Sequence, residues 1–182
     1  MNPRLIFAIV GILALLAGTA LYLGTPRTPA GPVPVVSDAA PGAIVATRFS
    51  DRQGQAHTLG EFQGRVVVLN FWATWCAPCR EEMPGFSRLQ ERWKDRGVRF
   101  VGVSDEERAK VDRFAGGMQI AYPLWTGDAE VMELSRRLGN RLGVLPHTVL
   151  LDGDGRVLES RIGIYPEKLL EERLAAIVGK SR

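Results

Sequence analysis

Two cysteines, Cys76 and Cys79, are the residues of this 182-residue chain whose type and spacing most directly suggest chemistry. They are the only cysteines in the sequence, and Ala77 and Pro78 separate them. If a helix begins near Cys76, this thiol lies at its exposed amino end, where unpaired N–H groups and the helix dipole favour a thiolate. Cys79 then lies one turn inside, as a thiol that resolves a mixed disulfide. The spacing predicts a redox pair, and Pro78 helps to fix the first helical turn.

A zinc site and a structural disulfide are the other interpretations of a closely spaced cysteine pair. A structural zinc ion needs four ligands, and His57 and His147 are the only histidines that could join the cysteines. A structural disulfide over so short a loop would remove little chain entropy from the unfolded state. Redox chemistry is therefore the favoured interpretation, and we expect neither a metal ion nor a cofactor.

The cysteine pair lies between a predicted strand and a predicted helix. Residues 66–71 form an apolar, β-branched run that is typical of a buried strand, and residues 79–94 show helical spacing with Pro84 as a predicted kink. The remaining expectations are strands at 43–49, 56–59, 98–103, 148–151 and 156–162, an extended segment at 122–125, and helices at 106–114, 129–138 and 166–177. This alternation predicts an α/β sheet that helices cover on both faces.

The amino-terminal part of the chain predicts a membrane attachment. Residues 5–24 contain no charge, and a helix of that length would span the hydrocarbon of a bilayer. A cleaved signal peptide is the alternative, because residues 18–20 offer a small-residue cleavage site. Residues 25–42 hold five of the eleven prolines and predict an extended linker. The domain expectation is therefore a membrane helix at 1–24, a linker at 25–42 and one folded domain at 43–182.

Net charge limits the classes of partner. The chain has 23 basic and 20 acidic residues, a net charge of +3, without a dense basic segment. A mild excess that is spread along the chain does not predict a phosphate-binding face. We therefore expect no nucleic-acid partner.

The segment from Asn70 to Pro84 resembles the active-site segment of thioredoxin-like proteins. It reads Asn-Phe-Trp-Ala-Thr-Trp-Cys-Ala-Pro-Cys-Arg-Glu-Glu-Met-Pro. It is most similar to the membrane-anchored, extracytoplasmic branch that includes TlpA-like and ResA-like reductases and the cytochrome c maturation thioredoxins. The resemblance runs from residue 43 or so to the carboxyl terminus. It implies a thioredoxin-like fold with an amino-terminal β-hairpin and a strand–helix insertion between residues 105 and 139.

Glu82 is a candidate for proton transfer at the cysteine pair. It follows Cys79 by three residues, so both side chains lie on one helix face. Glu81 and Glu82 could equally be exposed carboxylates that stabilise the helix dipole. The resemblance favours a catalytic role for Glu82, because ResA-like members have an acidic residue at the matching position. Plain thioredoxins instead have a buried aspartate where Asn70 stands here.

The resemblance also implies a substrate-binding surface formed by Trp75, Pro78, Leu145 and Pro146. Thioredoxin-like folds place a cis-proline before the strand that begins near residue 147, and Pro146 matches that position. The backbone of Leu145 would then pair with an extended substrate segment. His147 departs from the small polar residue, often threonine, that commonly follows this proline. Because side chains alternate along a strand, we expect His147 to face away from the cysteines.

Together, the cysteine pair, the amino-terminal segment and the resemblance predict a protein-disulfide reductase at the outer face of a bacterial cytoplasmic membrane. The resemblance implies a membrane protein as electron donor, and disulfides of apocytochrome c or copper-site assembly proteins as substrates. We expect a monomer. The alternatives are a disulfide donor that works in the oxidising direction, a peroxide-reducing relative, and a thiol-based chaperone or metallochaperone.

Overall fold

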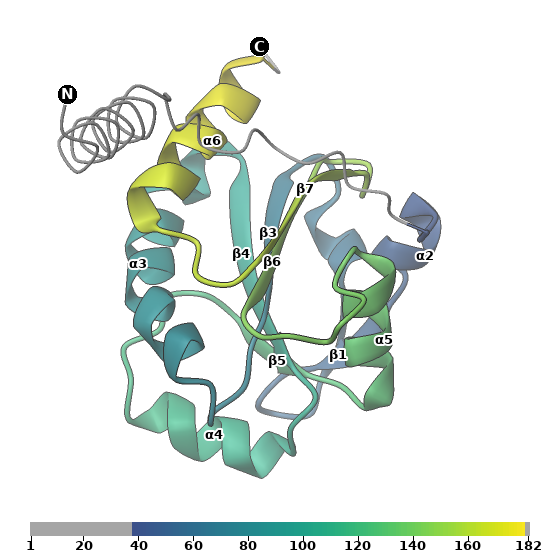
Figure 1. Ribbon diagram of the computed structural model, residues 1–182, viewed down its shortest axis with the longest axis vertical. Helices are drawn as coiled ribbons and strands as arrows, with labels where there is room; N and C mark the ends of the chain where they lie inside the picture. Colours follow the sequence, from purple (N-terminus) through teal and green to yellow (C-terminus); the bar gives the residue numbers. More distant parts are fainter. Residues whose placement is uncertain (1–37, 181–182) are drawn as a thin grey trace, which may run out of the picture. The chain divides into compact units, whose positions relative to one another are not determined.

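A seven-stranded sheet lies at the centre of the computed structural model, which describes residues 38–180 (Figure 1). The strand order is β2-β1-β5-β4-β3-β6-β7. The strands are β1 (Arg48–Ser50), β2 (Ala56–Thr58), β3 (Val66–Phe71), β4 (Val98–Ser104), β5 (Leu124–Thr126), β6 (His147–Leu151) and β7 (Val157–Ile162).

The strand β3 lies inside the sheet and determines where the cysteine pair is placed. It runs parallel to β4, with Val66 opposite Val98 and Phe71 opposite Val103. On its other side it runs antiparallel to β6, with Phe71 opposite His147. The carboxyl end of β3 and the amino end of β6 therefore meet at one edge of the sheet. The cysteines follow β3 and Pro146 precedes β6, so the cysteine pair and Pro146 both lie at this edge.

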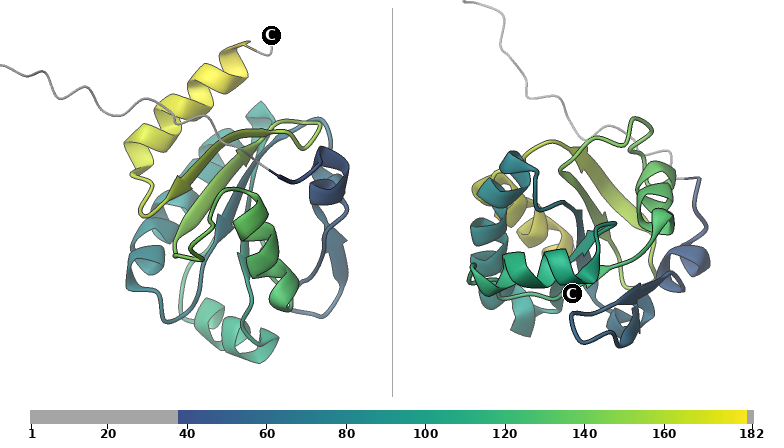
Figure 2. Two further views of the ribbon diagram at one scale, coloured as in Figure 1. Left: turned by 45° about the vertical axis from the view of Figure 1, so that its right-hand side comes forward. Right: turned by 90° about the horizontal axis from the view of Figure 1, so that it is seen from below.

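Helices cover both faces of the sheet (Figure 2). The helical elements are α2 (Pro41–Val45), η1 (Leu59–Phe62), α3 (Ala77–Trp93), η2 (Lys94–Arg96), α4 (Arg108–Gly116), α5 (Ala129–Arg137) and α6 (Glu167–Lys180). Buried residues of α3, α4 and α6 pack on one face, which we call the α3 face. Buried residues of α2, η1 and α5 pack on the other, which we call the α5 face.

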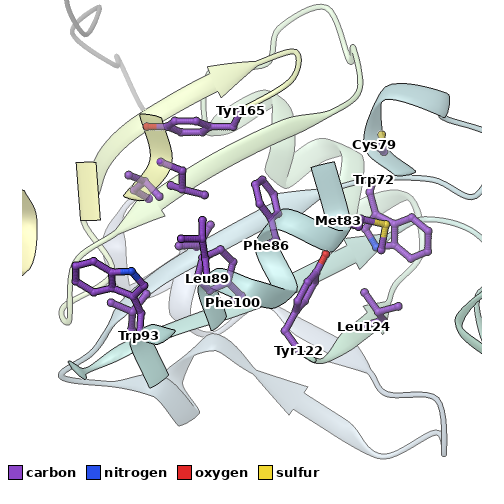
Figure 3. Packing of buried hydrophobic residues seen from close by; sticks show 14 of the residues in the cluster. Trp72, Cys79, Met83, Phe86, Leu89, Trp93, Phe100, Tyr122, Leu124 and Tyr165 are labelled. Atoms are coloured by element: carbon purple, nitrogen blue, oxygen red, sulfur yellow. The ribbon is translucent and has the colours of Figure 1, made fainter. Parts of the chain in front are cut away.

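Alternation along the central strands separates the two cores. Val68 and Leu150 contribute to the cluster on the α3 face, whereas Leu69 and Val149 contribute to the cluster on the α5 face. The α3-face cluster contains large side chains of α3 together with aromatic residues of β4 and of the chain before β5 (Figure 3). The members that Figure 3 labels are Trp72, Cys79, Met83, Phe86, Leu89, Trp93, Phe100, Tyr122, Leu124 and Tyr165. Cys79 is thus part of the hydrophobic core.

Most elements agree with the sequence-based expectations, but residues 43–45 do not. They belong to the helix α2 and not to a strand, and only residues 48–50 pair with β2. Pro41 at the start of α2 fits the first helical turn, and the helix buries one large apolar side chain, Ile44, on the α5 face. The helix also begins inside the segment that was predicted to be a linker. The hairpin itself is confirmed, with Gly54 at φ +84° in its turn.

The predicted membrane helix at residues 5–24 lies outside the described residues, as does most of the predicted linker. Within residues 38–180, the helices are all too short or too polar to cross a bilayer.

Pro84 lies inside α3, which continues from Ala77 to Trp93 without interruption.

Phe86→Ala should lower the free energy of unfolding by about 3–5 kcal/mol, because it leaves a cavity where the ring is buried. The Phe86 ring is fully buried and lies against Phe100, with 5.7 Å between ring centroids. Urea unfolding of the oxidised protein, followed by circular dichroism, measures the loss. Leu169→Ala, at an exposed position of α6, is the control and should cost less than about 1 kcal/mol. Equal losses in the two variants would contradict this description of the core.

Candidate active site

The helix α3 begins at the cysteine pair. Cys76 is its N-cap residue, and Sγ of Cys76 accepts a hydrogen bond from the backbone N–H of Cys79 at 3.3 Å. Pro78 lies in the first turn, where an absent N–H leaves no bond unmade. The two sulfurs form a disulfide, and the structure describes no free cysteine. The predicted placement of Cys76 at the amino end of a helix is therefore confirmed.

The two sulfurs differ in their access to solvent. Cys79 is completely enclosed in the α3-face core, whereas Cys76 retains a small exposed fraction of 4%. Unpaired N–H groups of the first helical turn and the helix dipole would stabilise negative charge at Cys76 more than at Cys79. This difference is what an attacking thiol and a resolving thiol require.

Glu82 is a buried carboxyl group one turn further along α3. Its side chain is only 6% exposed. Oε1 accepts a hydrogen bond from Nδ2 of Asn70 at 2.9 Å, and Oε2 accepts one from the backbone N–H of Tyr165 at 2.9 Å. Burial raises the pKa of Glu82 to about 7, although both hydrogen bonds and the positive charge of Arg161 act in the opposite direction. A carboxyl group with this pKa can both accept and release a proton near neutral pH.

Asn70 is a partner of Glu82 that the sequence analysis did not assign to the site. Its Nδ2 also donates to Oγ1 of Thr148 at 3.0 Å, so one amide connects β3, β6 and α3. A signal for this role was present in the sequence, because Asn70 interrupts an apolar strand on the same face as Val68 and Trp72. A polar residue in such a position needs a buried partner.

Glu106 is a second residue that the sequence analysis did not assign to the site. It was predicted to start a helix, but it lies two residues before α4. Its Oε2 accepts the backbone N–H of Thr74 at 2.5 Å, and its Oε1 accepts the Thr74 hydroxyl at 2.9 Å. Lys110 forms an ion pair with the same carboxylate. Glu106 therefore fixes the loop that leads from β3 to Cys76.

The predicted substrate-binding residues lie at the same edge of the sheet. The peptide bond between Leu145 and Pro146 is cis, as the resemblance implied. Leu145 is half-buried and packs against the cluster that contains both cysteines. Trp75, next to Cys76, is 67% exposed, so it does not pack in the core. Pro78 is half-buried.

His147 faces away from the cysteines, as alternation predicted. Its ring is buried on the α5 face and stacks on Phe71 with 5.2 Å between centroids. The ring nitrogens lie 2.8 Å from Oγ of Ser135 and 2.7 Å from Oγ of Ser160. Burial lowers the pKa of His147 to about 4, so the imidazole is neutral at pH 7. A direct effect of His147 on the thiols is therefore not supported.

Comparisons with known proteins agree with this geometry. A family model described as Redoxin matches residues 32–177. The thiol–disulfide oxidoreductase ResA of Geobacillus thermodenitrificans is 31% identical over 183 residues, which cover 97% of each chain. ResA of Bacillus cereus is 32% identical over 130 residues, which cover 70% of this chain and 72% of the relative.

Solved structures show the same fold. A putative protein disulfide isomerase from Bacteroides thetaiotaomicron superposes with a TM-score of 0.62 at 27% identity, over 72% of this chain and 82% of that one. A putative thiol:disulfide interchange protein DsbE from Chlorobium tepidum superposes with a TM-score of 0.61 at 24% identity, over 72% of this chain and 92% of that one.

The fold and the cysteine pair define the class of protein, a thiol–disulfide oxidoreductase with a thioredoxin-like fold. The chain belongs to the Redoxin family, among its TlpA-like and ResA-like thioredoxins.

Glu82→Gln should change how stability depends on pH. The pKa of Glu82 is about 7 in the folded protein, compared with an ordinary value of 4.5. Below pH 4.5 the carboxyl group is therefore protonated in both the folded and the unfolded protein, and its burial carries no penalty for a charge. Between about pH 4.5 and pH 7 the unfolded chain loses this proton while the folded protein keeps it, so the free energy of unfolding falls by about 3 kcal/mol and then stays level. The glutamine variant lacks this loss.

Urea unfolding of the oxidised proteins tests this expectation between about pH 4.5 and pH 8.5. The stability of Glu82→Gln relative to the parent protein should increase up to about pH 7 and then level off. A difference between the two proteins that does not depend on pH would show that Glu82 does not titrate as described.

Proposed function

We propose that this protein is a membrane-anchored, extracytoplasmic reductase of protein disulfides. The observation that supports the activity most directly is the pair itself, with Cys76 at the helix N-cap and Cys79 enclosed beneath it. The apolar segment at residues 5–24 supports attachment to a membrane, and the proline-rich segment that follows would hold the catalytic domain away from the surface.

The reduced enzyme begins with Cys76 as a thiolate. Its sulfur attacks one sulfur of a substrate disulfide, and the second substrate sulfur leaves as a thiolate that takes up a proton. A mixed disulfide now joins Cys76 to the substrate. Cys79 loses its proton and attacks Sγ of Cys76, which releases the second substrate thiol. The substrate gains two electrons and two protons, and the enzyme is left with the Cys76–Cys79 disulfide.

Glu82 is the proposed base for the Cys79 proton. Both side chains belong to the buried face of α3 and are separated by three residues, so they lie within one helical turn. A pKa of about 7 places the carboxyl group close to the neutral pH at which it would act. Asn70 and the N–H of Tyr165 hold the carboxyl in one orientation while it gains or loses the proton.

The substrate segment would bind across Trp75, Pro78, Leu145 and Pro146. The exposed ring of Trp75 offers an apolar surface beside Cys76, and the backbone of Leu145 would pair with an extended substrate strand. The proposed substrates are disulfides of apocytochrome c or of copper-site assembly proteins. Because an oxidising compartment cannot restore the dithiol, a membrane protein would supply the electrons by the same exchange chemistry.

A Cys79→Ser variant should trap the substrate, because the mixed disulfide at Cys76 can no longer be resolved. The full-length variant is expressed in cells, purified without reductant, and the attached proteins are identified by mass spectrometry. Cys76→Ser is the matched control and should trap far less, because its remaining sulfur is buried. Equal trapping by the two variants, or none by either, would contradict the proposed role of Cys76.

Membrane attachment should make the full-length protein resist extraction with alkaline carbonate, since a spanning helix remains in the bilayer. Protease added to the extracytoplasmic side should then digest the catalytic domain. Release of intact protein by carbonate would contradict the proposed anchor. Protection of the domain from the added protease would contradict the proposed orientation.

A further inference from the structure

The α5 face contains a group of buried polar side chains next to the cis-proline segment. Ser135 of α5, Asn140 of the following loop and His147 of β6 have no exposed surface. We propose that these three residues, the Ser135–Asn140–His147 network, position the loop at residues 140–146 so that it binds protein disulfides. This inference rests on the proposed function and assigns substrate affinity to residues that do not touch the cysteines.

Asn140 closes the loop through its side chain. Nδ2 of Asn140 donates to the carbonyl of Val144 at 2.8 Å, and Oδ1 accepts the N–H of Val144 at 3.0 Å. The N–H of Gly143 donates to the carbonyl of Asn140, and Gly143 adopts a left-handed φ of +64°. Val144 is the residue before Leu145 and Pro146. Both peptide groups of Val144 are therefore fixed immediately ahead of the proposed substrate contact.

The network connects this loop to three elements. The second proton of Nδ2 of Asn140 is donated to Oγ of Ser135 at 3.0 Å, which attaches the loop to α5. The same oxygen lies 2.8 Å from Nδ1 of His147, and Nε2 of His147 lies 2.7 Å from Oγ of Ser160 in β7. In the neutral ring one nitrogen donates and the other accepts, so both contacts can be hydrogen bonds. His147 is thus held from both sides, directly after Pro146.

Packing of the hydrophobic core does not by itself require three polar side chains at this place. The neighbours on the α5 face are apolar, and they include Phe71, Leu138 and Val149. Burying polar groups there costs desolvation that an aliphatic side chain would avoid. A fully bonded network instead gives one defined backbone arrangement. That arrangement leaves Leu142 85% exposed and Val144 44% exposed, as an apolar edge beside Leu145.

A loop that is fixed before binding loses little conformational freedom when a substrate strand pairs with it. A small disulfide needs only the thiols and makes no use of this loop. Loss of the network should therefore weaken the reaction with a protein disulfide and leave the reaction with a small disulfide unchanged.

The variants Ser135→Ala and Asn140→Ala test this with insulin and bis(2-hydroxyethyl) disulfide as the two substrates. Each variant should raise KM for insulin about tenfold, which corresponds to about 1.4 kcal/mol of binding. The kcat for insulin and the rate with the small disulfide should stay within about twofold of the parent values. Ser87→Ala is the matched control, because Ser87 is a buried helical serine outside the network, bonded to the carbonyl of Met83. It should leave both reactions unchanged.

Three results would overturn the inference: unchanged insulin kinetics in both variants, equal losses with insulin and the small disulfide, or the same insulin defect in Ser87→Ala. Circular dichroism at the assay temperature shows whether each variant is folded. If Asn140→Ala does not fold, Ser135→Ala alone decides, since it removes one hydroxyl and keeps the helix. Failure of the parent protein to reduce insulin would instead contradict the proposed function.

Discussion

The active site depends on one junction, where β3 ends and α3 begins at Cys76. The N–H groups of a first helical turn have no partners within the helix, and Sγ of Cys76 accepts the one from Cys79. The same turn encloses Cys79 in the core. Glu106 fixes the approach to the junction through Thr74, and the parallel pairing of β3 with β4 fixes its direction. The difference between the two sulfurs thus follows from the position of a helix end.

A buried carboxyl group is tolerated beside this junction because it is bonded on both oxygens. Without Asn70 and the N–H of Tyr165, Glu82 would leave two buried acceptors unpaired. The bonds do not remove the cost of burying charge, and this remaining cost holds the pKa near 7. Stability and proton transfer are therefore linked at one residue, since the burial that weakens the charged form also makes the group a useful base.

The sequence predicted the elements that local patterns determine. The bounds of β3 followed from an apolar run, and the orientation of His147 followed from alternation. Contacts between distant segments could not be read from such patterns. Asn70 and Tyr165 lie 12 and 83 residues from Glu82, and only the assembled sheet brings them to it. Residues 43–45 were assigned to a strand because a short apolar run does not distinguish a strand from a helix that buries one side chain.

The rate at which iodoacetamide alkylates Cys76 as a function of pH, in the reduced Cys79→Ser protein, tests the central claim most directly. Only the thiolate reacts, so the midpoint of the profile reports the pKa of this thiol. Stabilisation by the amino end of α3 predicts a midpoint at least one pH unit below the value of about 8.5 for an ordinary cysteine. A midpoint at or above about 8.5 would contradict the account, because the helix end would then give Cys76 no advantage as the attacking sulfur.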